Sequence, residues 1–170
     1  MEGRTIRIRL VRESDAQFIL SLRSDDKYNK YLSKTNSNVS DQVEWIKKYK
    51  VDETNKKQFY FIIEKLDGTP CGTVRIYDLQ NDSFCWGSWI LNESKTKYAA
   101  IESAFLVYRY GFEVIGCVKS HFDVRKDNEK VVSFHKRMGA VQTGEDKLNF
   151  YFEITKEAVA NARLGLEGKL

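Results

Sequence analysis

The segment CWGSWIL (85–91) is followed by a polar stretch, NESKTKY (92–98), and then by the apolar-striped run AAIESAFLVYRYGFEVIG (99–116). The first segment predicts a buried strand, and the run beginning near residue 98 predicts an amphipathic helix. A strand that enters a helix through a polar turn leaves free backbone amides at the helix start, where an anionic phosphate can bind. The middle of the chain therefore predicts a phosphate-binding turn.

A second strand and a second helix follow this turn. CVKSHFDV (117–124) alternates apolar and polar residues, as a half-buried strand does. NEKVVSFHKRMGA (128–140) predicts a helix that begins at Asn128 and ends at Gly139, a residue typical of helix C-termini. His135 lies two turns into this helix and offers a titratable group beside the predicted phosphate site.

The same periodicities cover the rest of the chain. The predicted strands span residues 4–12, 58–66, 71–79, 83–91, 117–124, 140–144 and 148–155. Ser14 and Ser40 have the position of N-caps for two helices in the N-terminal third, and the tail 156–167 has a helical pattern. The pattern predicts an α+β fold with a mixed, mostly antiparallel sheet of about seven strands and helices on both faces.

Composition limits the classes of function. The 170 residues, 42% hydrophobic and 13% aromatic, suit one packed domain spanning residues 1–170. A net charge of +4 favours an anionic ligand but is too small to indicate nucleic acid. The N-terminus has no apolar signal region, and no apolar run approaches the roughly 18 residues of a membrane span. Three cysteines without a CxxC pair indicate reduced thiols, small core residues and a cytoplasmic location.

The order of strand, phosphate-type turn, helix, strand and Asn-led helix resembles the GNAT acetyltransferases over about residues 5–155. With its leading IRIRLVRESD (6–15), the chain is most similar to the RimJ/RimL-like branch. The resemblance implies acetyl-CoA as the acetyl donor, no metal, and direct transfer to a primary amine without a covalent enzyme intermediate. It allows a homodimer and implies neither a nucleic-acid nor a membrane partner.

The resemblance also implies where the cofactor binds. The family motif [RQ]-x-x-G-x-[GA] corresponds to residues 95–100, with Tyr98 at a position where the family has glycine. The alternative is an ordinary solvated connection between strand and helix. The cofactor-binding residues implied in this way are Ile90, Leu91, Lys95, Thr96, Lys97, Tyr98, Ala99, Ala100, Asn128 and Lys136.

Two histidines are the candidate catalytic residues. His135 has the position of the family tyrosine that protonates the departing thiolate, and a histidine can do the same. The equal alternative is that His135 packs or hydrogen-bonds near the end of its helix. The family's usual general base, a glutamate, corresponds to Cys85, so His121 is a replacement base if its side of the strand 117–124 lines the cleft. Otherwise His121 is a surface residue. Asp78 and Glu93, at strand ends, are the alternative bases.

The acceptor is predicted from polar and aromatic side chains near the cleft. Side chains that can hydrogen-bond or stack against a sugar are Tyr28, Tyr31, Arg75, Tyr77 and Asp78. The ending SFHKRMGA (133–140) resembles acetyltransferases of amino sugars, so an amino sugar or nucleotide-linked amino sugar is the favoured acceptor. The alternatives are a protein N-terminus, an antibiotic, a polyamine, or a CoA-binding module without catalysis.

Overall fold

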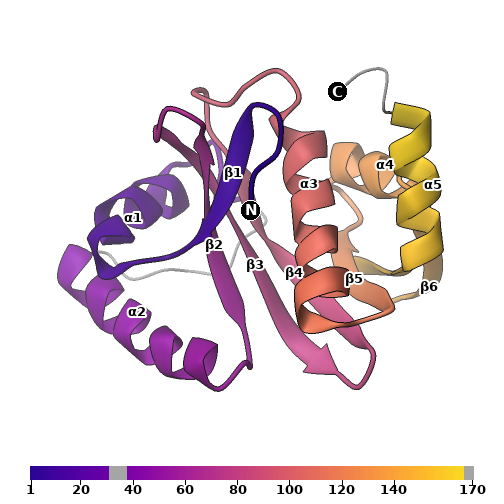
Figure 1. The fold of residues 1–170 in the computed structure, drawn as a ribbon, viewed down its shortest axis with the longest axis horizontal. Coiled ribbons are helices and arrows are strands. Elements are labelled where there is room, and N and C mark those ends of the chain that lie inside the picture. Colours follow the sequence, from indigo (N-terminus) through magenta and orange to yellow (C-terminus); the bar gives the residue numbers. More distant parts are fainter. Residues whose placement is uncertain (31–37, 167–170) are drawn as a thin grey trace.

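The computed structural model describes residues 1–30 and 38–166, and its centre is a seven-stranded sheet (Figure 1). The strands are β1 (Ile6–Leu10), β2 (Phe59–Lys65), β3 (Pro70–Gln80), β4 (Ser83–Leu91), β5 (Lys119–Arg125), β6 (Val141–Glu145) and β7 (Asn149–Thr155). The helices are α1 (Ala16–Ser24), α2 (Val39–Thr54), α3 (Ala99–Arg109), α4 (Glu129–Arg137) and α5 (Lys156–Leu166), with the short turns η1 (Glu13–Asp15) and η2 (Tyr110–Ile115).

The strands lie in the order β1-β2-β3-β4-β5-β7-β6, and every neighbouring pair is antiparallel except β4 and β5. The parallel pair is short, because only Ser83 with Lys119 and Phe84 with Ser120 are in register. In the ribbon the two strands then separate (Figure 1). The predicted α+β fold, with a mixed, mostly antiparallel sheet and helices on both faces, is confirmed.

Side-chain alternation along β2 divides the interior into two layers. Phe59, Phe61 and Ile63 belong to the larger core, which includes residues of α3, whereas Tyr60 and Ile62 pack with residues of α1 and α2. Figure 1 shows α1 and α2 on one side of the sheet and α3 and α5 on the other. Because both faces of β2 are covered, its sequence is an apolar run without polar alternation.

Two helix starts differ from the predicted caps. Asn38, and not Ser40, caps α2, because the Asn38 side-chain oxygen accepts a hydrogen bond of 2.8 Å from the Asp41 amide. Ser14 lies inside the turn η1, and α1 begins two residues later at Ala16. The Asp15 side chain makes no cap hydrogen bond to α1 and instead accepts one of 2.7 Å from the Arg12 amide at the start of η1.

The predicted helix over residues 98–115 consists of two parts. It is α-helical as α3 and then widens into a π-helical turn, η2, which ends at Gly116 in the left-handed conformation (φ 93°). Gly111 in this turn packs directly on the ring of Phe84, one of the two β4 residues in the short β4–β5 pairing. The close contact joins the end of the helix to the last paired position of the two strands.

We predict that Gly111→Ala destabilises the protein. A Cβ at this position would lie 2.1 Å from Cε1 of Phe84, so the ring or the helix must move. Overpacking of this kind costs about 1–3 kcal/mol in the free energy of unfolding, measured by urea denaturation. Gly165→Ala in α5 is the matched control, because nothing lies within 4 Å of its added methyl group. Equal stability of Gly111→Ala and wild type would contradict the packing argument.

Candidate active site

A cavity of about 250 Å³ opens where β4 and β5 part. Beyond Phe84 and Ser120, no further pairs join these strands within the described part of the chain, so the edge of β4 that faces β5 has free backbone groups. The cavity is lined by Tyr77, Trp86, Gly87, Ser88, Trp89, Phe122, Asp123, Val124, Arg125, Asn128, Val131, His135 and Asn149.

The path of β4 beside this cavity is irregular. Its register with β3 shifts between Thr73 and Arg75, and Ser88 adopts a left-handed conformation (φ 49°). The Thr73 hydroxyl donates a 3.2 Å hydrogen bond to the Ser88 carbonyl and holds this bend. Left-handed residues other than glycine are strained and gather at functional sites. The bulge therefore turns the free edge of β4 toward the cavity.

His135 lies in a box of aromatic rings at the α4 side of the cavity. Its ring centroid is 4.3 Å from that of Phe122 and 5.4 Å from that of Trp86. The residue is 4% exposed, and neither ring nitrogen has a hydrogen-bond partner among the residues described. Burial lowers the pKa of His135 to about 4, so the ring is neutral near pH 7. A buried, unpartnered polar ring that lines a cavity is available to a ligand.

The buried His135 makes stability depend on pH. Its pKa is about 4 in the folded protein and about 6.5 in an unfolded chain. Between these values the unfolded state binds more protons, so the free energy of unfolding increases with pH. We expect this residue to remove about 3 kcal/mol as the pH falls from about 7 to about 4.

Urea unfolding of wild type and His135→Phe at several pH values within that window measures this contribution. The phenylalanine variant should lack it, whereas His121→Gln, the matched control, should keep it. Parallel stability profiles for wild type and His135→Phe would show that His135 is not held neutral by the fold.

The turn between β4 and α3 has free backbone amides, as predicted. Within the described residues, the amides of residues 96–98, 100 and 101 donate no hydrogen bond. Lys95 and Lys97 are exposed beside them, and the Lys97 ammonium lies 5.2 Å from the centroid of the Tyr98 ring. Free amides at a helix start next to two cations form an anion-binding arrangement.

A chain of hydrogen bonds joins this turn to the N-terminal segment. The buried Glu102 carboxylate accepts from the backbone amides of Arg4 (2.8 Å) and Thr5 (2.9 Å) and from the Thr5 hydroxyl. The Thr5 and Thr96 hydroxyl oxygens are 2.7 Å apart. Because an ionised carboxylate only accepts, Thr5 donates to Glu102 and Thr96 donates to Thr5.

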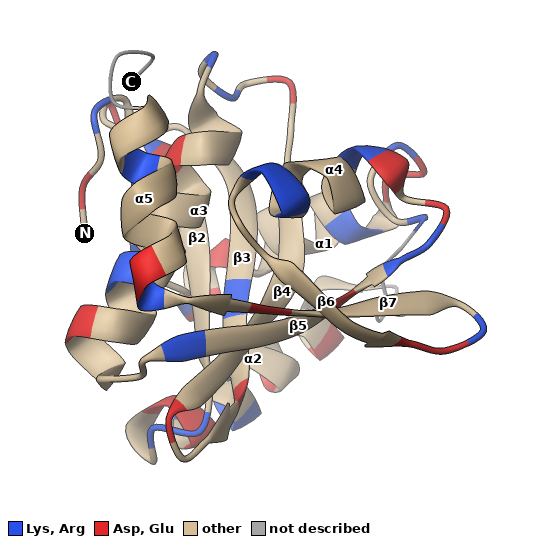
Figure 2. Cartoon of the chain, turned by 90° about the vertical axis from the view of Figure 1, so that its right-hand side faces the viewer, with Lys and Arg blue, Asp and Glu red and all other residues tan. Residues whose placement is uncertain are grey.

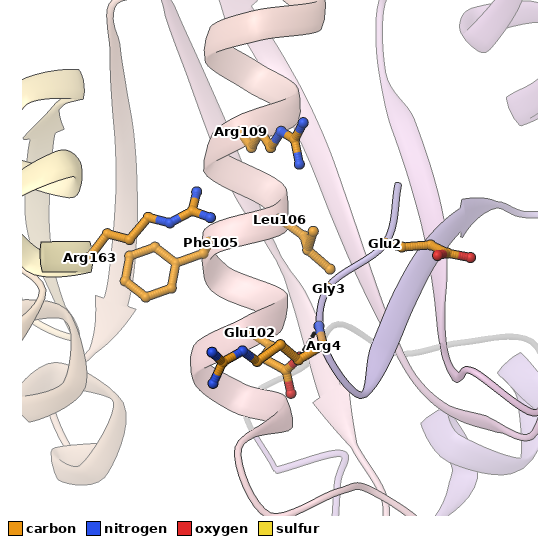
Figure 3. Close-up of a pocket in the computed structure, with 8 residues that line it drawn as sticks. All are labelled: Glu2, Gly3, Arg4, Glu102, Phe105, Leu106, Arg109 and Arg163. Atoms are coloured by element: carbon orange, nitrogen blue, oxygen red, sulfur yellow. Dashed lines mark hydrogen bonds between the residues drawn. The ribbon is translucent and has the colours of Figure 1, made fainter. Parts of the chain in front are cut away.

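Figure 3 shows Glu102 on α3 beside Arg4 of the N-terminal segment, and both residues lie in the wall of a second cavity of about 280 Å³. The lining residues are Glu2, Gly3, Arg4, Glu102, Phe105, Leu106, Arg109 and Arg163. This cavity is distinct from the one between β4 and β5, and the two share no lining residue. Its relevance to the active site is that Glu102 lies in its wall and orders the turn before α3.

Three of the predicted acceptor residues form a group on β3. The Arg75 guanidinium lies 4.3 Å from the centroid of the Tyr77 ring, and Tyr77 lines the cavity. Nε of Arg75 is buried without a hydrogen-bond partner in the described structure. Asp78 follows in a left-handed conformation (φ 47°). Tyr28 lies on the loop after α1, where the neighbouring Lys27 binds Glu93 at 3.0 Å, and Tyr31 is outside the described residues.

His121 and Asp78 interact with each other outside the cavity. Nε2 of His121 is 2.9 Å from the Asp78 carboxylate, and Nδ1 is 2.5 Å from the Ser83 hydroxyl. Both ring nitrogens are therefore occupied, and neither His121 nor Asp78 lines the cavity. Cys85, at the position of the family glutamate, is buried, which raises the pKa of its thiol to about 11 and keeps it protonated.

The predicted cofactor residues divide into two groups. Asn128, at the start of α4, lines the cavity. Ile90 and Leu91 end β4 and lead directly into the turn at the start of α3, where all the other predicted cofactor residues except Lys136 lie. Lys136 instead lies on another face of α4, where its ammonium is 5.9 Å from the centroid of the Phe150 ring. The helical period explains the difference, because adjacent residues such as His135 and Lys136 point about 100° apart.

Comparison with known proteins gives the family. Residues 5–141 match the family model described as the acetyltransferase (GNAT) domain. The chain belongs to the GNAT acetyltransferase family. It is therefore an enzyme, and enzymes of this family use acetyl-CoA. No curated protein has a sequence that matches this one significantly.

Solved structures of GNAT proteins share the fold. Apo FdhC, described as a nucleotide-linked sugar GNAT, is 50% identical with a TM-score of 0.88, over 96% of this chain and 93% of its own. Ribosomal-protein-S5-alanine acetyltransferase from Vibrio fischeri is 16% identical with a TM-score of 0.79, over 92% of this chain and 96% of its own. RimJ from Mycobacterium smegmatis, in complex with CoA-disulfide, is 16% identical with a TM-score of 0.79, over 95% of this chain and 89% of its own.

Within residues 1–30 and 38–166, no three His, Cys, Asp or Glu side chains gather as metal ligands would. In the same residues, no helix has the length and apolar character needed to cross a bilayer. The ribbon coloured by residue type in Figure 2 shows basic and acidic positions interspersed along α4, α5 and the β6–β7 hairpin.

Sequence reasoning did not select Asp123, which lines the cavity from β5. The available signal was its position two residues after His121, on the same side of the strand. Nothing in the sequence shows which part of that side faces the opening, because this depends on where β4 and β5 stop pairing.

Proposed function

We propose that this GNAT enzyme transfers an acetyl group from acetyl-CoA to the primary amine of a nucleotide-linked amino sugar in the cytoplasm. The observation that carries the proposal is 50% identity, over 96% of the chain, with a protein described as a nucleotide-linked sugar GNAT. The three unpaired, buried cysteines favour a reducing compartment.

The acceptor side of the cavity has groups that suit a nucleotide-linked sugar. Arg75 lies against the Tyr77 ring but does not itself line the cavity; its guanidinium donates a 3.3 Å hydrogen bond to the Gln58 side chain, and its Nε is buried without a partner in the described structure. A guanidinium that turned toward a bound diphosphate would hold it through paired hydrogen bonds. The Tyr77 ring against it offers a surface for stacking and a hydroxyl at the cavity. A polyamine or a protein N-terminus would leave this cation without an anionic partner.

The turn residues fit the diphosphate of acetyl-CoA. The free amides of residues 96–98 and 100 would hold it, with Lys95 and Lys97 adding attraction between opposite charges. Ala100 has a small side chain that leaves the backbone accessible, and the Tyr98 ring lies beside the loop. Acetyl-CoA supplies an activated thioester when it is bound.

Residues of the cavity would act on the thioester end. The free backbone groups of β4 beyond Phe84 would bind the pantetheine arm, and an amide there would stabilise the oxyanion. His135 would act as a neutral ring, because its pKa is about 4. A neutral imidazole donates a hydrogen bond to the leaving sulfur without first carrying an extra proton. This refines the expected role of the residue from proton donor to hydrogen-bond donor.

Turnover on an acceptor panel tests the proposal. The panel consists of UDP- and dTDP-linked sugars with an amine at carbon 2, 3 or 4, the corresponding free amino sugars, spermidine, and a peptide with a free N-terminus. We expect release of free CoA thiol with at least one nucleotide-linked amino sugar, at a kcat/KM at least about 100-fold above that for the free sugar. Preference for the peptide or spermidine would overturn the proposed acceptor, and CoA binding without any turnover would favour a non-catalytic module.

We also predict that Thr96→Val weakens acetyl-CoA recognition. The substitution deletes the hydroxyl that donates to Thr5 and leaves the Thr5–Glu102 bond intact. Loss of one such hydrogen bond corresponds to about a 3- to 10-fold rise in KM for acetyl-CoA, with little change in kcat.

The KM for S-acetylpantetheine, which has no diphosphate, should not change. Thr54→Val is the matched control, because its hydroxyl bonds only to the Lys50 carbonyl on α2. An equal rise in KM for both thioesters, or for both variants, would show that Thr96 does not order a diphosphate-binding turn.

A further inference from the structure

We propose that Asp123 binds the amino group of the acceptor and accepts its proton as the new amide bond forms. The inference rests on the proposed function and deepens it, because it assigns the base that Cys85 cannot supply. Asp123 lies on β5, lines the cavity, and is exposed to it. It has no hydrogen-bond or ion-pair partner among the described residues.

The surroundings of Asp123 leave its carboxylate available. Its cross-strand neighbour on β7 is Tyr151, whose hydroxyl donates to Asp146. The next residue on the same side of β5, Arg125, lies 3.9 Å from Asp127, which is an ion pair of its own. An uncommitted carboxylate at the mouth of a cavity attracts an ammonium group, and this Coulomb attraction strengthens when a bound substrate displaces water.

The neighbouring candidates are less suited to accept the proton. His121 has both ring nitrogens occupied, by Asp78 and Ser83. Burial raises the pKa of Tyr77 and of Cys85, so neither is deprotonated near neutral pH. Glu153 on β7 lies 3.5 Å from Lys119 and outside the cavity. Asp123 is therefore the carboxylate in the cavity lining that is free to bind an amine.

The acceptor binds as an ammonium ion and loses one proton to water, and the nitrogen lone pair then attacks the thioester carbonyl carbon. As the C–N bond forms, the carbonyl electron pair moves onto oxygen and the nitrogen becomes strongly acidic. Asp123 accepts a proton from this nitrogen, the carbonyl re-forms, and the C–S bond breaks with its electrons leaving on sulfur. The thiolate takes a proton from water, and Asp123 releases its proton to water, so one proton is released overall.

Substitution of Asp123 by asparagine tests the assignment, because the amide has the same shape but accepts no proton. We expect Asp123→Asn to lower kcat by about 100-fold or more with the best nucleotide-linked amino sugar. The Kd for acetyl-CoA should be unchanged, because Asp123 faces the acceptor. Asp123→Glu should retain more activity than Asp123→Asn. Glu153→Gln is the matched control, a neighbouring carboxylate outside the cavity, and should be as active as wild type.

Calorimetry with CoA-saturated enzyme separates amine binding from catalysis. Asp123→Asn should weaken binding of the amino sugar nucleotide but not of the same nucleotide sugar with a hydroxyl in place of the amine. Equal weakening of both ligands, or an unchanged kcat, would overturn the role of Asp123 while the proposed function stands. If wild type acetylates none of the nucleotide-linked amino sugars, the proposed function fails first, and this assignment fails with it.

Discussion

The brevity of the parallel pairing between β4 and β5 is the constraint on which the active site depends. Two residue pairs join the strands, and the sheet continues on either side through the β3–β4 and β5–β7 pairings. Each strand beyond that point has one edge with unpaired backbone groups, which in a protein interior must be satisfied by water or a ligand. The cavity, the accessible edge of β4 and the position of Asp123 all follow from this separation.

Aromatic side chains occupy the side of the opening next to α4. Trp86 from β4 and Phe122 from β5 have ring centroids 6.1 Å apart, and the His135 ring packs against both. This cluster contributes hydrophobic burial at a place where the sheet has lost hydrogen bonds. The cluster also keeps His135 neutral. The two expectations for this residue, packing in the core and a role at the leaving sulfur, are therefore compatible. Both follow from burial of an imidazole among rings.

The proposed cofactor site and the proposed acceptor site differ in charge in a way that suits the two substrates. Free amides and lysines surround the turn before α3, where a polyphosphate would bind. Uncommitted Asp123 faces the acceptor side, with Arg75 and Tyr77 nearby on β3. The turn is further ordered through Thr96, Thr5 and Glu102, which connects the N-terminal segment to the proposed cofactor site although these residues are far apart in sequence.

The sequence by itself determined the type and order of nearly every strand and helix, and the free amides before α3. These are local properties, set by apolar periodicity, turn residues and the strand–turn–helix order. It placed the helix caps less well, because Asn38 and the serines near it have similar preferences and only backbone geometry chooses among them. The tertiary structure alone decided which polar side chains meet. His121 and Asp78, 43 positions apart, bind each other instead of facing the cavity, whereas Asp123 faces it. The reason is physical: the site lies where two strands stop pairing, and that point is fixed by packing between distant segments, such as Gly111 against Phe84.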